Sequence, residues 1–235
     1  MRANLRWLEA TMAIVLAAMT GVACATTPAV EVDISYLALG DSYTIGEGVA
    51  AGGGWPDQLA RLLRDDGIAL AAPRVIATTG WTTDELDAAI DATTPLGEYG
   101  FVSLLVGVND QYRGRPLDEY RGRFDNLLQR AIGFAGGRSD RVLVLSIPDW
   151  GVTSFGHASG RDLAQIAREL DAYNAVASEL CDARDVAFVD ITAINRARGA
   201  EPAMLAEDGL HPSAAMYAQW AQLALPVARQ LLEQP

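Results

Sequence analysis

The chain has 235 residues, half of them apolar, and a formal net charge of -12. This length fits one globular α/β domain with an extra segment, and the acidic balance argues against a protein that binds nucleic acid through its phosphates. All 18 basic residues are arginine, which excludes a phosphate-loop lysine, a Schiff-base lysine and a Ser-Lys dyad.

The N-terminal segment has the pattern of an export signal. Two arginines precede a short apolar run at 11–23, and small residues around Cys24 offer a cleavage site. The run is short for a membrane span of ~20 residues, although an uncleaved anchor stays open. Residues before Cys24 also resemble a lipoprotein box, so lipidation of Cys24 competes with cleavage after Ala25. We therefore expect a signal at 1–25 and a domain at 26–235. The protein is expected to be exported and to be secreted, periplasmic or lipid-anchored. A membrane tether, if there is one, would lie in residues 1–25.

An apolar run at 34–39 opens the domain and stops at Gly-Asp-Ser, which predicts a buried strand that delivers Ser42 to a loop, with Asp41 bracing it. Helical and strand patterns then alternate along the chain. Strands are expected at 74–78, 101–106, 141–147 and 186–190, and helices at 55–64, after the Thr82 capping box, at 117–134, at 163–180 and after His211.

Three details accompany this alternation. Residues 150–160 form a glycine-bearing stretch that we expect to be a loop. Pro212 is expected at the first position of the last helix, and Pro226 is expected to kink or divide that helix. Cys181 is expected to be a small buried apolar residue late in its helix.

The alternation predicts a three-layer α/β/α domain with a doubly wound, five-stranded parallel sheet. The carboxyl ends of parallel strands share one edge, where open α/β sheets bind ligands. Ser42, Gly80, Asn109 and the stretch that begins at Trp150 all follow strands. We therefore expect these four segments to converge at that edge.

A serine needs a base before it can act as a nucleophile, and the sequence offers two histidines. His211 follows Asp208 by three residues and precedes a proline, which holds it in an extended conformation. His157 has no such acid and is expected on a loop or at a pocket rim. With only two histidines and two scattered cysteines, no structural zinc site is expected. Taken singly, Ser42 and Asn109 could instead be turn residues and His211 a helix-start residue.

Four separated blocks, GDSYTIGEG, TGWTT, GVND and DGLHPS, resemble the SGNH or GDSL hydrolase family in the family's order. The resemblance covers the chain after the signal and is greatest to compact bacterial single-domain members. It implies a flavodoxin-like hydrolase fold and a serine esterase with no cofactor and no metal. Ser42 would attack the ester carbonyl, His211 would be the general base, and Asp208 would orient it. The backbone N–H groups of Ser42 and Gly80 and the amide of Asn109 would form the oxyanion hole.

The substrate stays open at this point. Trp81, Tyr112, Trp150 and Phe155 are expected around Ser42, where aromatic rings could hold an acyl chain, stack on a sugar or cover the edge of the core. Small acyl esters, lysophospholipid-type esters and O-acetylated carbohydrates are all compatible with them. A secreted, non-catalytic binding protein that retains the fold is the alternative from another class, although such a protein needs none of the polar residues of the four blocks.

Overall fold

The computed structural model describes residues 33–93 and 95–233. Within these residues, five strands form one parallel sheet in the order β2-β1-β3-β4-β5, which confirms the predicted doubly wound fold. The strands are β1 (Tyr36–Asp41), β2 (Arg74–Thr78), β3 (Phe101–Leu105), β4 (Val142–Leu145) and β5 (Ala187–Val189). The predicted signal at 1–25, with the candidate lipidation site Cys24, lies outside the described residues.

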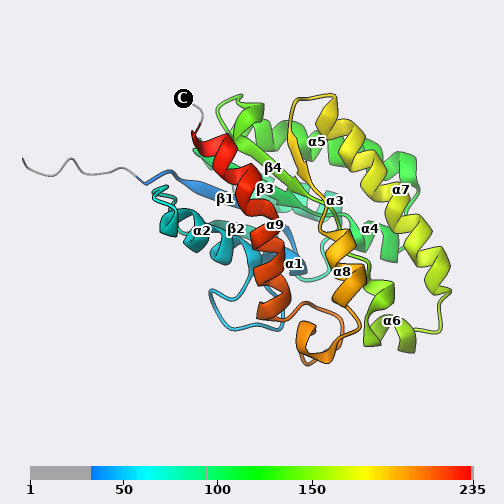
Figure 1. The fold of residues 1–235 in the computed structure, drawn as a ribbon. Coiled ribbons are helices and arrows are strands. Elements are labelled where there is room, and N and C mark those ends of the chain that lie inside the picture. The colour runs from blue at the N-terminus through cyan, green and yellow to red at the C-terminus, as the bar shows by residue number, and fades with distance from the viewer. Residues whose placement is uncertain (1–32, 94, 234–235) are drawn as a thin grey trace, which may run out of the picture. The chain divides into compact units, whose positions relative to one another are not determined.

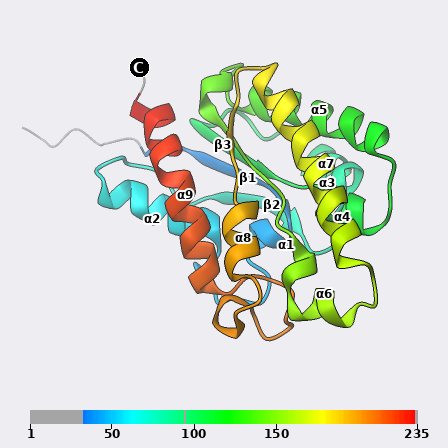
Figure 2. The same ribbon diagram turned by 45° about the vertical axis from the view of Figure 1, so that its right-hand side comes forward.

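Helices cover both faces of the sheet (Figures 1 and 2). On one face α2 (Trp55–Asp65) packs along α9 (Ala214–Glu233), and on the other α5 (Leu117–Phe134) packs between α3 (Thr83–Thr93) and α7 (Leu163–Asp182). The winding reverses between β1 and β3, so the crevice for a ligand is expected at the carboxyl ends of these two strands. In the described part of the chain, no helix is both long and apolar enough to cross a membrane.

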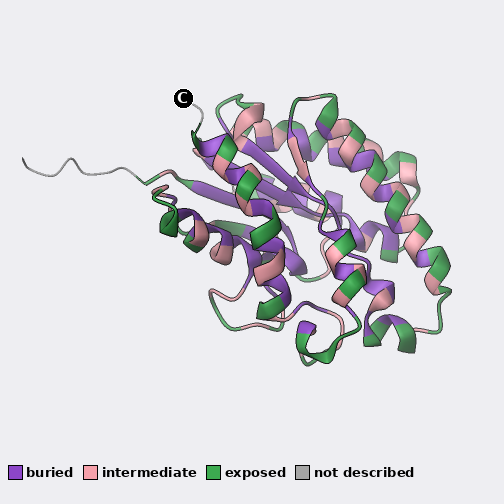
Figure 3. Cartoon of the chain, in the orientation of Figure 1, coloured by how far each residue is buried: buried purple, intermediate pink, exposed green. Residues whose placement is uncertain are grey.

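The core lies between these layers, as the burial colours of Figure 3 show. β1, β3 and β4 are buried along their whole length, because helices cover both of their faces, whereas the edge strand β2 is largely exposed. Cys181 is fully buried as predicted, and burial raises the pKa of its thiol to about 12. At that pKa the thiol is an inert packing group.

The sequence pattern missed the short elements, which lie mostly at the carboxyl edge of the sheet. Residues 150–160 are not the predicted loop: Asp149 caps a 3₁₀ turn and Thr153 caps a short helix there through side-chain oxygens that accept backbone N–H groups. Such single turns depend on caps rather than on a hydrophobic period. The short elements are α1 (Ser42–Ile45), α4 (Val108–Tyr112), α6 (Ser154–Ala158), α8 (Thr192–Arg198) and 3₁₀ turns at Ser139–Arg141, Trp150–Val152 and Pro202–Met204.

The last helix differs from the expectation in two respects. α9 begins at Ala214, so Pro212 is not its first residue; Pro212 instead pairs with Leu205 in an antiparallel bridge. α9 also runs through Pro226 without being divided. A proline removes one backbone donor, and the buried alanines on either side, Ala224 and Ala228, keep both halves packed.

Candidate active site

Ser42 is the first residue of the four-residue helix α1, directly after β1, rather than part of an open loop. The turn is tight because Asp41 has an extended backbone and its Oδ1 accepts the Tyr43 N–H at 3.0 Å, the bracing role predicted for it. Gly40 is required for the close approach of the next strand, because a Cβ there would collide with Thr44 and with the backbone oxygen of Leu105.

The Asp41 carboxyl is fully buried beneath the nucleophile turn. Burial raises its pKa to about 8, against the lowering effect of the Tyr43 N–H bond. The second carboxyl oxygen, Oδ2, is enclosed and has no hydrogen-bond partner among the described residues. Asp41 is therefore largely protonated at neutral pH, which places no negative charge beside Ser42.

Gly80 occupies the turn between β2 and α3, at a φ of 83° that favours glycine. Its N–H donates to no group among the described residues, whereas its carbonyl oxygen accepts from Arg113 at 2.6 Å. The Asn109 amide donates to the Trp81 carbonyl at 2.9 Å, which fixes the amide's orientation and leaves its second N–H for another acceptor. Two N–H groups from separate segments are thus available at this edge of the sheet.

Two further contacts hold the Gly80 turn. Buried Asp110 accepts the Thr83 N–H at 2.9 Å and the Thr83 hydroxyl at 2.7 Å, which ties the start of α3 to α4. Thr79 also donates a short hydrogen bond to Glu47, beyond α1. The segments that carry Ser42, Gly80 and Asn109 are therefore joined through side-chain contacts as well as through the sheet.

His211 lies in the connection before α9, and Asp208 fixes its ring. The Nδ1 atom of His211 lies 2.5 Å from Asp208 Oδ2, while Oδ1 of the same carboxylate accepts the backbone N–H groups of Leu210 and His211, each at 2.9 Å. Partial burial raises the pKa of Asp208, but these hydrogen bonds outweigh it and the net pKa is lowered. A carboxylate on Nδ1 selects the tautomer whose Nε2 is free to accept a proton.

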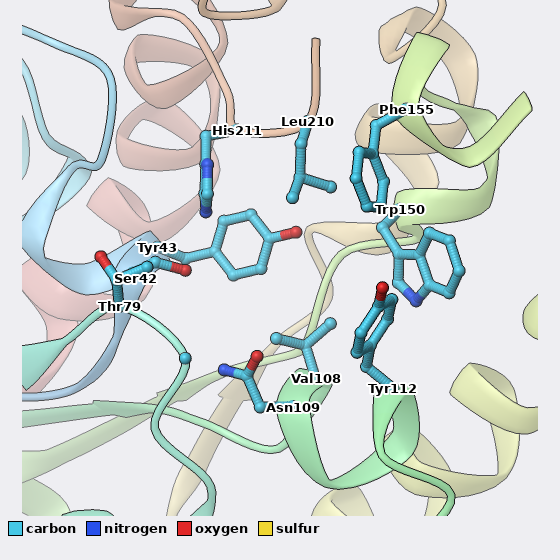
Figure 4. Close-up of a pocket in the computed structure, with 11 residues that line it drawn as sticks. Ser42, Tyr43, Thr79, Val108, Asn109, Tyr112, Trp150, Phe155, Leu210 and His211 are labelled. Atoms are coloured by element: carbon cyan, nitrogen blue, oxygen red, sulfur yellow. The ribbon is translucent and has the colours of Figure 1, made fainter. Parts of the chain in front are cut away.

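These groups open on one cavity of about 200 Å³, the Ser42 pocket. Figure 4 shows the His211 ring above the Ser42 side of the pocket, Asn109 below it, and the rings of Tyr112, Trp150 and Phe155 at the opposite end. Ser42 and His211 line the same side of the pocket, and no direct hydrogen bond joins them in the described structure. The complete lining is Ser42, Tyr43, Thr79, Gly80, Val108, Asn109, Tyr112, Trp150, Phe155, Leu210 and His211.

A cluster of aromatic side chains forms the end of the pocket opposite Ser42. The Tyr112 and Trp150 rings meet nearly edge to face with centroids 5.3 Å apart, and Phe155 lies 6.1 Å from Trp150. The Arg161 guanidinium lies over the Tyr112 ring at 5.0 Å from its centroid, and Trp150 donates from Nε1 to Gln111 at 2.8 Å. Tyr112 and Phe155 stay exposed at the rim, whereas Trp150 is buried.

Two of the residues singled out in the sequence lie elsewhere. Trp81 does not line the Ser42 pocket: its side chain packs against the core, and only its carbonyl oxygen reaches Asn109. His157 is exposed on α6 and faces a separate hollow beside Asp149 and Arg196. No group of metal-ligating side chains occurs among residues 33–93 and 95–233.

Four lining residues were missed: Tyr43, Thr79, Val108 and Leu210. Each directly precedes or follows a residue that the sequence did single out. The signal that could have found them is this adjacency, because a short helix or tight turn exposes neighbouring side chains to the same cavity.

A family model described as GDSL-like lipase/acylhydrolase matches residues 38–219, well over half of the chain. The chain belongs to this family. The GDSL family assignment makes it an ester hydrolase and argues against the non-catalytic alternative. No curated protein matches the chain significantly in sequence.

Solved structures share the GDSL hydrolase fold at low identity. The lipase Lip_vut3 from a goat rumen metagenome has a TM-score of 0.69 at 18% identity, over 85% of this chain and 100% of that one. A lipase/acylhydrolase from Enterococcus faecalis gives 0.63 at 19%, over 84% and 96%. A variant of Axe2, an acetyl-xylooligosaccharide esterase from Geobacillus, gives 0.63 at 20%, over 86% and 95%. These likenesses show the fold.

Proposed function

We propose that the protein hydrolyses carboxylic esters of short acyl groups through an acyl-enzyme on Ser42. The observation that carries this proposal is the Ser42 pocket itself. It is lined by a hydroxyl, an imidazole whose Nδ1 is held by a carboxylate, a free backbone N–H and a fixed amide. An acyl transfer needs this set: a nucleophile, a base and donors for the developing negative charge.

In the proposed mechanism, Ser42 Oγ attacks the ester carbonyl carbon while His211 Nε2 takes the hydroxyl proton. Asp208 stabilises the imidazolium that forms, and the N–H groups of Ser42, Gly80 and Asn109 bind the oxyanion. His211 then gives the proton to the leaving alkoxide, which departs as an alcohol. Water, deprotonated by His211, attacks the acyl-enzyme, and the carboxylic acid leaves Ser42 free again.

The directions within the pocket favour the aromatic end for the acyl group. With the oxyanion toward Gly80 and Asn109 and the leaving oxygen toward His211, the remaining substituent of the carbonyl carbon points toward Trp150 and its neighbours (Figure 4). A cavity of about 200 Å³ lies below the ~300–1,000 Å³ of pockets that enclose drug-sized ligands. Its size therefore favours a short acyl group over a long lipid chain.

An O-acylated carbohydrate is the second candidate for the alcohol part. The exposed rings of Tyr112 and Phe155 at the rim are the observation that favours it, because aromatic faces stack on sugar rings, and Axe2 shares the fold. We further propose that the protein acts outside the cytoplasm, on the pattern of residues 1–25.

The test uses p-nitrophenyl esters from acetate to dodecanoate and an acetylated xylo-oligosaccharide, with wild type, Ser42→Ala, His211→Ala and the double variant. We expect activity to fall with acyl length and a burst of nitrophenol at high enzyme concentration. We also expect the double variant to be little worse than either single variant, because the two residues act as one unit. Ser42→Ala turning over at the wild-type rate would refute the proposal.

A further inference from the structure

Tyr43, the residue after the nucleophile, is an unexplained polar group in the Ser42 pocket. Its side chain is only 3% exposed, and no hydrogen bond joins its hydroxyl to any described residue. Figure 4 shows the ring along the pocket and the hydroxyl at its far end, pointing away from Ser42 toward the space between Leu210 and Trp150. The hydroxyl is not among the fully enclosed unpaired atoms of the described residues, so it opens on the pocket, where a bound molecule or water can be its hydrogen-bond partner.

The side chains around the Tyr43 hydroxyl are mostly apolar. Val108, Trp150, Phe155 and Leu210 present apolar groups to this end of the pocket, and the Trp150 N–H already donates to Gln111. The other hydroxyl at this end is that of Tyr112, at the exposed rim. Tyr43 also stands where the letters of the GDSL family name place leucine. A leucine would complete an apolar wall at this position, so the tyrosine adds a polar point among the side chains of Val108, Leu210 and Trp150.

The ring is held firmly enough to present that point. It packs between His211, with centroids 5.4 Å apart, and Trp220, with centroids 5.9 Å apart. Burial, together with Asp41, Asp208 and Asp149 in their ionised forms at high pH, raises the Tyr43 pKa, so the phenol stays neutral and can donate or accept. At neutral pH the carboxylates of Asp208 and Asp149 disfavour a substrate with a negative charge at this position.

We propose that the acyl group of the substrate carries a neutral oxygen, a hydroxyl or a keto group, that hydrogen-bonds the Tyr43 hydroxyl. The inference rests on the proposed function, which places the acyl group along the Tyr43 ring. Tyr43 is then a specificity-determining residue: it selects oxygen-bearing acyl groups over plain ones of the same length and over acyl groups that end in a carboxylate.

The test compares phenyl esters in matched pairs: 3-hydroxybutanoate with butanoate, 4-oxopentanoate with pentanoate and 5-oxohexanoate with hexanoate. The value of kcat/KM is measured for wild type, Tyr43→Phe and Tyr217→Phe. Tyr217 is the control tyrosine: its hydroxyl is buried without a partner among the described residues and, unlike that of Tyr43, does not line the pocket. The within-pair ratio, compared between enzymes, cancels differences in intrinsic ester reactivity and in the amount of folded protein.

We expect wild type and Tyr217→Phe to share a preference for at least one oxygen-bearing ester that Tyr43→Phe loses by about tenfold, the usual scale for one buried hydrogen bond. A phenyl monosuccinate should be a poor substrate of all three enzymes. Ratios that are equal in wild type and Tyr43→Phe for all three pairs would overturn the inference and mean that the hydroxyl binds water. The proposed function fails by a different result, namely turnover of phenyl butanoate that survives Ser42→Ala.

Discussion

The buried carboxyl of Asp41 makes a sharp prediction about stability and pH. Its folded pKa of about 8 lies above the ordinary 3.8, so the folded chain keeps a proton that the unfolded chain releases. Stability therefore falls as pH rises from about 4 to about 8, with a limiting slope of ~1.4 kcal/mol per pH unit for one proton. Below this window both states are protonated, and above it both are ionised, so the contribution is constant on either side.

Asp41→Asn removes this titration and keeps an oxygen that can accept the Tyr43 N–H. Its free energy of unfolding relative to wild type should rise by ~2–3 kcal/mol between pH 5 and pH 7, whatever constant offset the amide introduces. Urea unfolding followed by circular dichroism at half-unit pH steps measures this difference, and Asp118→Asn, at an exposed carboxyl on α5, serves as control. A difference between Asp41→Asn and wild type that does not change with pH would refute the assignment of a buried, protonated Asp41.

Three other predictions follow from the same edge of the sheet and from the N-terminal pattern. Asn109→Ala should lower kcat for p-nitrophenyl acetate by ~10²–10³ while circular dichroism stays unchanged, and a loss below threefold would remove Asn109 from the oxyanion hole. Gly40→Ala should cost ~1–3 kcal/mol of unfolding free energy, because the new methyl group meets Thr44 and the Leu105 carbonyl; an unchanged melting temperature would contradict this. The intact mass of the exported protein should lack the signal, with a diacylglyceryl group if Cys24 is lipidated, and a mass that still includes Met1 would argue against cleavage.

The sequence predicted the long elements because their patterns have many repeats. The buried runs of β1 and β3 and the helical stripe of α7 each contain enough apolar positions to fix both type and place. Once the strands are parallel, their carboxyl ends must meet at one edge, so the approach of Ser42, Gly80 and Asn109 followed from topology. The place of His211 beside them does not follow from topology, because it precedes α9 rather than following a strand.

What the sequence could not predict depends on single turns and side-chain directions. Each of the helical turns at 150–160 is held by one capping side chain, and both are too short to show a hydrophobic periodicity in the sequence. Trp81 follows Gly80 directly, yet its side chain packs, partly buried, against the core while its carbonyl supports Asn109. The burial of Tyr43 and the free end of its ring require the packing of α9 against the nucleophile turn, which is a long-range contact.

The claim at the centre of this account is that Ser42 is a nucleophile activated by His211. A fluorophosphonate probe followed by peptide mass spectrometry tests it directly, in wild type, His211→Ala and His157→Ala with folding checked by circular dichroism. We predict that one residue, Ser42, is labelled, at similar rates in wild type and His157→Ala and at least a hundredfold more slowly in His211→Ala, on the scale of general base catalysis. Label on another serine, or fast labelling of His211→Ala with none of His157→Ala, would contradict it.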